Sequence, residues 1–221
     1  MNFLADFITI LSLICGFISI IFSLESHFTF ACWAIIVSVL FDGLDGQIAR
    51  KNPVPSEFGR ELDSLVDVVS FGIAPSILGY IFVYRQFYFW ATLALFIYLF
   101  CSVMRLAKYN ITPKEKLVNY FYGVPTTASG GMLASFILLY RKYTRLPSPF
   151  IFVLLVLILA FMMVSRVRYL NLDGLKQLLG KSLLPILCIA LVLIVFWPEI
   201  TIFALFVLYL LFSPLLVRQI A

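Results

Sequence analysis

Long apolar runs, each about the length of a membrane span, are separated by short polar segments along this chain. About 20 apolar residues cross a hydrocarbon core about 30 Å thick, so each long apolar run predicts one transmembrane helix. The runs predict about eight such helices, at roughly 3–24, 28–48, 60–84, 87–107, 118–140, 147–166, 182–198 and 200–217. The two-residue alternation typical of a membrane β-barrel is absent from the sequence. The pattern therefore predicts an all-α, polytopic membrane protein.

The composition supports this class. Of the 221 residues, 63% are hydrophobic and 12% are charged, whereas about a quarter of the residues in a soluble protein are charged. No repeat, low-complexity segment or linker divides the chain, so we expect one membrane domain. Leucines and lysines within residues 168–181 could form an amphipathic helix at the membrane surface, although a short connector between spans is the simpler interpretation.

The positive charges predict the orientation. Of the 16 lysines and arginines, all but Arg85, Arg141, Lys142 and Arg145 lie on the side that contains residues 50–60. The positive-inside rule therefore predicts a multi-pass protein of the cell membrane, with both termini and this side in the cytoplasm. The net charge of +5 suits a protein that faces anionic lipid headgroups. Nothing in the composition indicates a nucleic-acid partner.

Four aspartates interrupt the second and third apolar runs. The sequence D-G-L-D-G-Q-I-A-R begins at Asp42, and G-R-E-L-D-S-L-V-D ends at Asp67. Residues three or four apart share one face of a helix, so Asp42 and Asp45 face one way on the second helix, and Asp63 and Asp67 face one way on the third. Each aspartate in mid-membrane costs about 2.5–3.5 kcal/mol on an insertion scale. Such a cost indicates a functional site.

Convergent carboxylates without histidine or cysteine form an all-oxygen site, which suits two divalent cations, Mg²⁺ or Mn²⁺, with Ca²⁺ as a competitor. Two such ions could clamp a pyrophosphate during in-line displacement. Gly46 and Gly59 leave room for a nucleotide near the backbone, and Arg50 can pair with a phosphate. The alternative is that the aspartates pair with Arg50, Lys51 and Arg60 and seal a polar helix interface.

The pattern D-x-x-D-G-x-x-A-R, eight residues, then G-x-x-x-D-x-x-x-D resembles the signature of the CDP-alcohol phosphotransferases. These membrane enzymes join a CDP-linked group to an alcohol and release CMP. The positions that match the signature are Asp42, Asp45, Gly46, Ala49, Arg50, Gly59, Asp63 and Asp67. The resemblance implies a six-helix catalytic core with a cytoplasm-facing dimetal site, over residues 1–181. Residues 182–221 would be a two-helix extension in the same membrane domain.

The resemblance also implies roles for the motif residues. Asp42, Asp45 and Asp63 would be metal ligands, and Asp67 would be a metal ligand or the general base. The residues that would bind CDP are Asp42, Gly46, Arg50 and Gly59.

Three further segments resemble the phosphatidylserine synthase branch of this family. They are S-F-G-I-A-P-S from Ser70, R-L-A-K-Y-N from Arg105 and Y-G-V-P-T-T from Tyr122, where Thr126 and Thr127 depart from the usual pattern. The branch implies a CDP-lipid donor (CDP-diacylglycerol or CDP-archaeol), L-serine as the acceptor, and a homodimer. The serine hydroxyl would attack the lipid-side phosphate in a single displacement, with Asp67 as the base.

The acceptor pocket needs a cation for the serine carboxylate. Arg105 and Lys108 could supply it, or could simply snorkel at the interface. Asn110 could bind serine or only stop the helix before Pro113. Two other functions stay open. The same chemistry could use glycerol phosphate or inositol phosphate, although these acceptors would favour a denser basic cluster. A divalent-cation transporter could use the aspartates, although it leaves Arg50 and the motif glycines unexplained.

Overall fold

The structure is a computed structural model, which describes residues 3–50, 57–83, 88–112, 120–143, 149–171, 174, 177–178, 180 and 183–217. The helices in these ranges are α1 (Phe3–Leu24), α2 (Phe28–Arg50), α3 (Glu57–Asp67), a π-helix (Val68–Ile73), α4 (Ala74–Val83), α5 (Tyr88–Ile111), α6 (Thr126–Tyr143), α7 (Pro149–Val164), α9 (Leu183–Phe196) and α10 (Pro198–Val217). Two short strands, β1 (Tyr120–Tyr122) and β2 (Arg168–Leu170), complete the described elements.

The expected all-α membrane fold is confirmed. Helix α3, the π-helix and α4 run on as one 27-residue rod, and this rod is one of five described segments that are long and apolar enough to cross a membrane. The others are α1, α2, α5 and α10, while α7 is a shorter apolar helix. The chain is therefore a multi-pass membrane protein.

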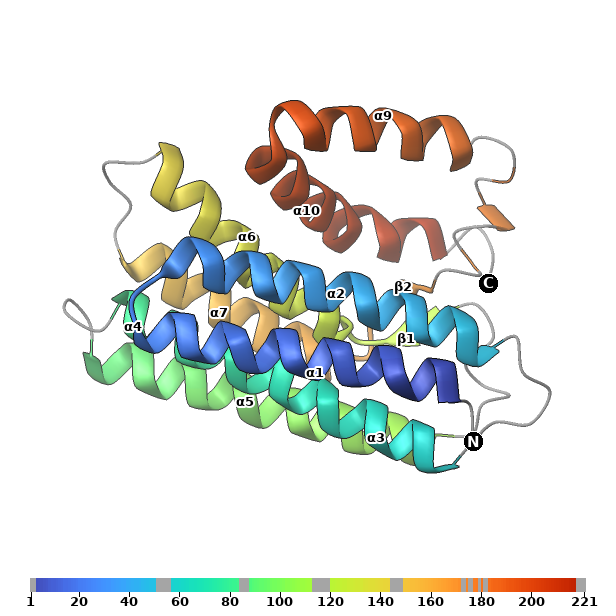
Figure 1. The fold of residues 1–221 in the computed structure, drawn as a ribbon, viewed down its shortest axis with the longest axis horizontal. Coiled ribbons are helices and arrows are strands. Elements are labelled where there is room, and N and C mark those ends of the chain that lie inside the picture. The colour runs from blue at the N-terminus through green and yellow to red at the C-terminus, as the bar shows by residue number, and fades with distance from the viewer. Residues whose placement is uncertain are drawn as a thin grey trace.

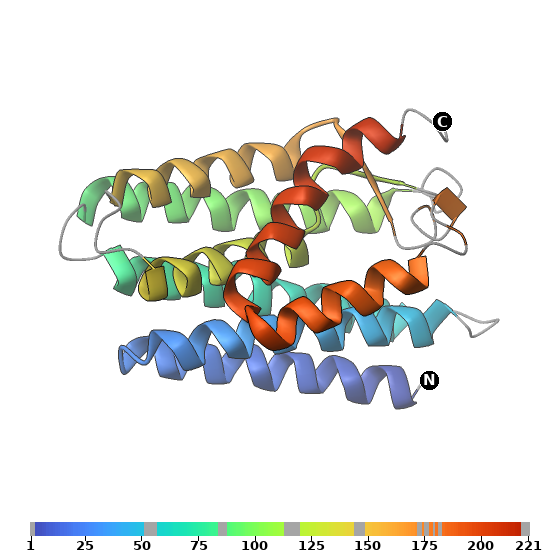
Figure 2. The same cartoon turned by 90° about the horizontal axis from the view of Figure 1, so that it is seen from above.

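Helices α1 to α7 lie side by side in one bundle, α10 packs against one flank of it, and α9 packs against α10 (Figure 1). Helix α10 crosses the bundle obliquely (Figure 2) and contacts α6 and β2. A Cβ atom on Gly131 of α6 would lie 2.8 Å from a ring carbon of Phe206 on α10, so a larger residue here would require the Phe206 ring to move. The division at residue 181 between a core and an extension stays a prediction.

The π-helix starts directly after Asp67 and contains most of the S-F-G-I-A-P-S segment. Such segments widen one helical turn and frequently occur at functional sites. Neighbouring helices hold this one in place. The Tyr98 hydroxyl of α5 donates to the Phe71 carbonyl at 2.9 Å, and the Ser70 hydroxyl donates to the Ser12 carbonyl of α1 at 3.2 Å. The segment therefore fixes the rod that carries Asp67 against α1 and α5.

The predicted helix at 118–140 is wrong at its start, and the first residues of the segment 168–181, for which a connector was the simpler interpretation, form a strand. Helix α6 begins only at Thr126, because Pro125 precedes it and Gly123 adopts a left-handed conformation with φ of 74°. Residues 120–122 instead form β1, which pairs antiparallel with β2 at 168–170. Strands of three residues are too short to show a sequence period. The rest of the segment 168–181 lies largely outside the described residues.

Replacing Gly123 with alanine is expected to destabilise the fold by about 2–5 kcal/mol. A left-handed residue with a side chain costs about 1–2 kcal/mol, and an overpacked contact costs about 1–3 kcal/mol more. The new Cβ would overlap the Met163 carbonyl group. The measurement is the thermal unfolding midpoint in detergent, with Gly43→Ala as the control, because a Cβ on Gly43 meets nothing within 4 Å. Equal midpoints for the two variants would contradict the prediction.

Candidate active site

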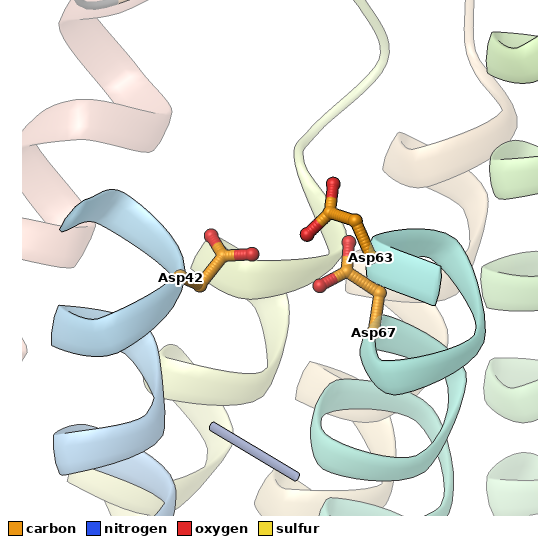
Figure 3. Close-up of side chains that lie close together, drawn as sticks. All are labelled: Asp42, Asp63 and Asp67. Atoms are coloured by element: carbon orange, nitrogen blue, oxygen red, sulfur yellow. The ribbon is translucent and has the colours of Figure 1, made fainter. Parts of the chain in front are cut away.

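Helices α2 and α3 bring three carboxylates together. Asp42 of α2 faces Asp63 and Asp67 of α3 (Figure 3), and one oxygen from each lies within 4.8 Å of the others. Asp63 and Asp67 are four residues apart and therefore share one face of α3. All three side chains are half-buried. The predicted meeting of the two aspartate motifs is thus present in the structure for these three residues.

Asp45 lies outside this group of three. It follows Asp42 by one turn of α2, is only 4% exposed, and its Oδ2 atom has no hydrogen-bond partner among the described residues. Thr9 of α1 lies next to its carboxylate. Asp6, one turn before Thr9, is buried as well and has an Oδ2 atom without a described partner. Asp45 therefore borders the carboxylate group on its α1 side, and its role as a ligand stays a prediction.

The three carboxylates fit a divalent cation. The Oδ1 atom of Asp67 is buried without a hydrogen-bond partner among the described residues. Leaving a buried carboxylate oxygen unpaired is costly, and a bound cation would remove this cost. The donors are all oxygens, which suits Mg²⁺ or Mn²⁺. Arg60, one candidate for sealing the aspartates in a helix interface, forms an ion pair with Glu61 at 3.5 Å.

The predicted nucleotide-binding residues lie at the same end of the two helices. Gly46 is one turn beyond Asp42, Gly59 is one turn before Asp63, and both are half-buried. Arg50 ends helix α2, but its side chain lies outside the described residues, as does the connection 51–56. The binding of CDP by these residues stays a prediction.

Arg105 of α5 is joined to the carboxylate site through one hydroxyl group. Its Nη1 atom donates to Thr126 Oγ1 at 3.3 Å, and Thr126 Oγ1 donates to Asp67 Oδ2 at 3.3 Å. Arg105 is buried, with 9% of its surface exposed, so it does not snorkel toward the interface. Its Nε atom has no described hydrogen-bond partner. The positively charged Arg105 side chain therefore lies beside the carboxylates, and its Nε–H group could donate a hydrogen bond to a ligand.

Thr126 is a site residue whose role sequence analysis did not recognise. It is the first residue of α6 and is 1% exposed. Its departure from the usual family pattern was visible, yet nothing local to Thr126 indicates that its hydroxyl bridges residues 59 and 21 positions away in the chain.

Lys108 and Asn110 stand farther along α5. Lys108 is exposed. The Asn110 Oδ1 atom accepts a hydrogen bond from the Ser64 hydroxyl at 3.1 Å, and Nδ2 donates to Glu61 at 3.4 Å. Asn110 therefore joins α5 to α3 in this structure. That Lys108 and Asn110 bind the acceptor stays a prediction.

Comparison with known proteins gives a consistent result. The sequence profile of the family described as CDP-alcohol phosphatidyltransferase matches residues 2–167. A CDP-diacylglycerol--serine O-phosphatidyltransferase of Helicobacter pylori is 32% identical over 83% of this chain and 78% of its own length. The protein of the same name from Bacillus subtilis is 32% identical over 76% of this chain and 90% of its length. An archaetidylserine synthase of Methanothermobacter thermautotrophicus is 32% identical over 77% of this chain and 71% of its length.

Proposed function

This chain belongs to the CDP-alcohol phosphatidyltransferase family, and we propose that it transfers the phosphatidyl (or archaetidyl) group of a CDP-linked lipid to the hydroxyl of L-serine, releasing CMP. The observation that carries the proposal is the arrangement of Asp42, Asp63 and Asp67 beside the buried Arg105. The names of the relatives support serine as the acceptor. These names refer to diacyl lipids in two of the relatives and to an archaeal lipid in the third. Either CDP-diacylglycerol or CDP-archaeol would therefore be the donor.

The acidic residues would hold the metal ions of the reaction. Asp42, Asp45, Asp63 and Asp67 would bind two divalent cations, Mg²⁺ or Mn²⁺, which when bound offset the negative charge that develops on the pyrophosphate. Gly46, Gly59 and Arg50, with Asp42, would bind the CDP group near the same helix ends.

Asp67 would act as the general base. The Thr126 hydroxyl donates to the Asp67 Oδ2 atom, and the Asp67 Oδ1 atom, which has no hydrogen-bond partner among the described residues, would accept the serine hydroxyl proton when it does not bind a metal ion. The serine oxygen then attacks the lipid-side phosphorus, the bond between this phosphorus and the CMP oxygen breaks, and CMP leaves. Arg105 would pair with the serine carboxylate through its Nε–H group, which has no hydrogen-bond partner among the described residues. Because Thr126 contacts both Arg105 and Asp67, it sets the distance between the acceptor's carboxylate and the base.

The orientation and the assembly are also part of the proposal. The distribution of lysine and arginine supports a cytoplasmic active site and cytoplasmic termini. A homodimer is expected from the family resemblance.

The test is CMP release by the purified full-length protein in detergent, with CDP-diacylglycerol and Mg²⁺. Release that requires L-serine and stops when EDTA removes the metal is the expected result. Release only with glycerol 3-phosphate or inositol phosphate would overturn serine as the acceptor. No release with any of these alcohols, from either diacyl or diether CDP-lipid, would overturn the transferase function, and metal flux into protein-containing liposomes would then support a transporter.

A further inference from the structure

A polar cluster lies between β2 and α10, beyond the residues 2–167 that match the family profile. Ser213 of α10 accepts a hydrogen bond from the Leu170 N–H at 2.6 Å, and the Tyr209 hydroxyl donates to the Leu170 carbonyl at 3.1 Å. The rings of Tyr169 and Tyr209 are tilted against each other, with centroids 5.9 Å apart. Helix α10 thus fixes the position of β2 through both main-chain groups of one residue.

Tyr169 stands out in this cluster. Its side chain is fully buried, at 0% exposure, and its hydroxyl has no hydrogen-bond partner among the described residues. Buried hydroxyl groups nearly always have a partner, because an unpaired one has lost its water without compensation. Burial raises the pKa of the Tyr169 phenol, so it keeps its proton and remains a donor. A ligand that accepts this hydrogen bond would account for the unpaired group.

Strand alternation places Tyr169 on the inner face of the two-stranded sheet. It pairs with Phe121 of β1, whereas the guanidinium of its neighbour Arg168, which is exposed, lies 4.8 Å from the ring centre of Tyr120. The ring of Phe121 in turn packs 5.8 Å from that of Tyr109 in the last turns of α5. The inner face of the sheet therefore rests on the end of α5 that carries Arg105.

Two connections link the cluster to the active site. The Tyr209 phenol lies close enough to the Arg105 guanidinium for electrostatic interaction. Strand β1 also leads within four residues to Thr126, which contacts Arg105 and Asp67. Tyr209 therefore links Tyr169 to Arg105, because its ring packs against that of Tyr169 and its phenol interacts with Arg105.

We propose that Tyr169 is an acceptor-binding residue, whose hydroxyl donates a hydrogen bond to the carboxylate of the amino-acid acceptor beside Arg105, and that α10 positions it through Tyr209 and Ser213. This inference rests on the proposed function. It extends the active site to a helix outside the family-matched region. Tyr169 would thereby supply, in addition to Arg105, a second donor for the carboxylate of the acceptor.

Tyr169→Phe tests the proposal, because it removes only the hydroxyl. The KM for L-serine is expected to rise about tenfold, the effect of losing one hydrogen bond to a charged group. The KM for CDP-lipid should be unchanged. The unfolding midpoint should not fall, because the deleted hydroxyl has no hydrogen-bond partner in the part of the chain that the structure describes. Tyr140→Phe is the matched control, since it removes a phenol hydroxyl from the bundle near Phe82, away from the carboxylates, and its KM for serine should equal that of wild type.

The outcomes separate this inference from the function on which it rests. No serine-dependent CMP release by the wild-type protein would overturn the proposed function. An active wild type with an unchanged serine KM in Tyr169→Phe would overturn the role of Tyr169 alone.

The positioning role of α10 has its own test. Tyr209→Phe removes the hydrogen bond to the Leu170 carbonyl. Like Tyr169→Phe, it is expected to raise the KM for serine. In the double variant with Tyr169→Phe the two effects should not add, because both act through one contact. Additive effects would show that Tyr209 acts independently and would overturn the positioning role.

Discussion

Asp67→Asn is expected to abolish turnover while leaving the binding of CDP-lipid intact. The amide has nearly the same shape and can still accept the hydrogen bond from Thr126, but it cannot take the proton of the attacking hydroxyl. Loss of a general base costs about 10²–10⁴-fold in rate. The measurement pairs CMP release with a direct CDP-lipid binding assay on the same preparation. Because the buried Asp67 Oδ1 atom has no hydrogen-bond partner among the described residues, the change should not lower the unfolding midpoint.

Glu57→Gln is the matched control for this variant. It makes the same acid-to-amide change in the first turn of α3, at an exposed position away from the carboxylate group. Its turnover should equal that of wild type. Turnover of Asp67→Asn within a few-fold of wild type would remove Asp67 from the role of base, whatever its part in metal binding.

Asp63→Asn is expected to lose metal affinity and turnover together. Asp63 is one of three carboxylates whose oxygens lie within 4.8 Å of one another, so the substitution removes one negative charge from the centre of the site. Mutation of a residue that only orients a metal-binding side chain lowers metal affinity about 10–100-fold. Loss of a metal-binding side chain itself should lower it at least as much. Several kcal/mol of transition-state stabilisation by metal ions corresponds to about 10³-fold in rate.

Mn²⁺ titration followed by electron paramagnetic resonance measures the affinity directly, and CMP release at increasing Mn²⁺ measures the rate. Part of the turnover should return at high Mn²⁺ in Asp63→Asn, because the remaining carboxylates still bind the ion weakly. An Mn²⁺ affinity equal to that of wild type would contradict the assignment of Asp63 as a ligand. The control Glu57→Gln should leave the affinity unchanged.

The site was predictable from the sequence to the extent that it depends on local periodicity. The four-residue spacing of Asp63 and Asp67 sets their common face, and two antiparallel spans bring Asp42 to the same depth. The structure places these three residues together as expected. Asp45 shares the motif but lies outside the group of three, because its distance from α3 depends on how α2 is rotated against its neighbours, and spacing does not determine this rotation.

The acceptor side was less predictable. The charge of Arg105 marked it as a candidate, but a cationic side chain near the end of a span either snorkels or turns inward. Its burial and its bond to Thr126 depend on α6 starting at residue 126. That start depends on the left-handed turn at Gly123 and on strand pairing with residues 168–170. None of these partners is near Arg105 in the chain.

By itself, the sequence determined the membrane class, the number of apolar segments and the aspartate motifs, because hydropathy and helical period are properties of neighbouring residues. Only the tertiary structure decided that a π-helix follows Asp67, that Thr126 joins Asp67 to Arg105, and that the buried Tyr169 hydroxyl has no hydrogen-bond partner among the described residues. These features arise from contacts between segments distant in the chain. Their formation depends on how whole helices pack, which no local pattern encodes.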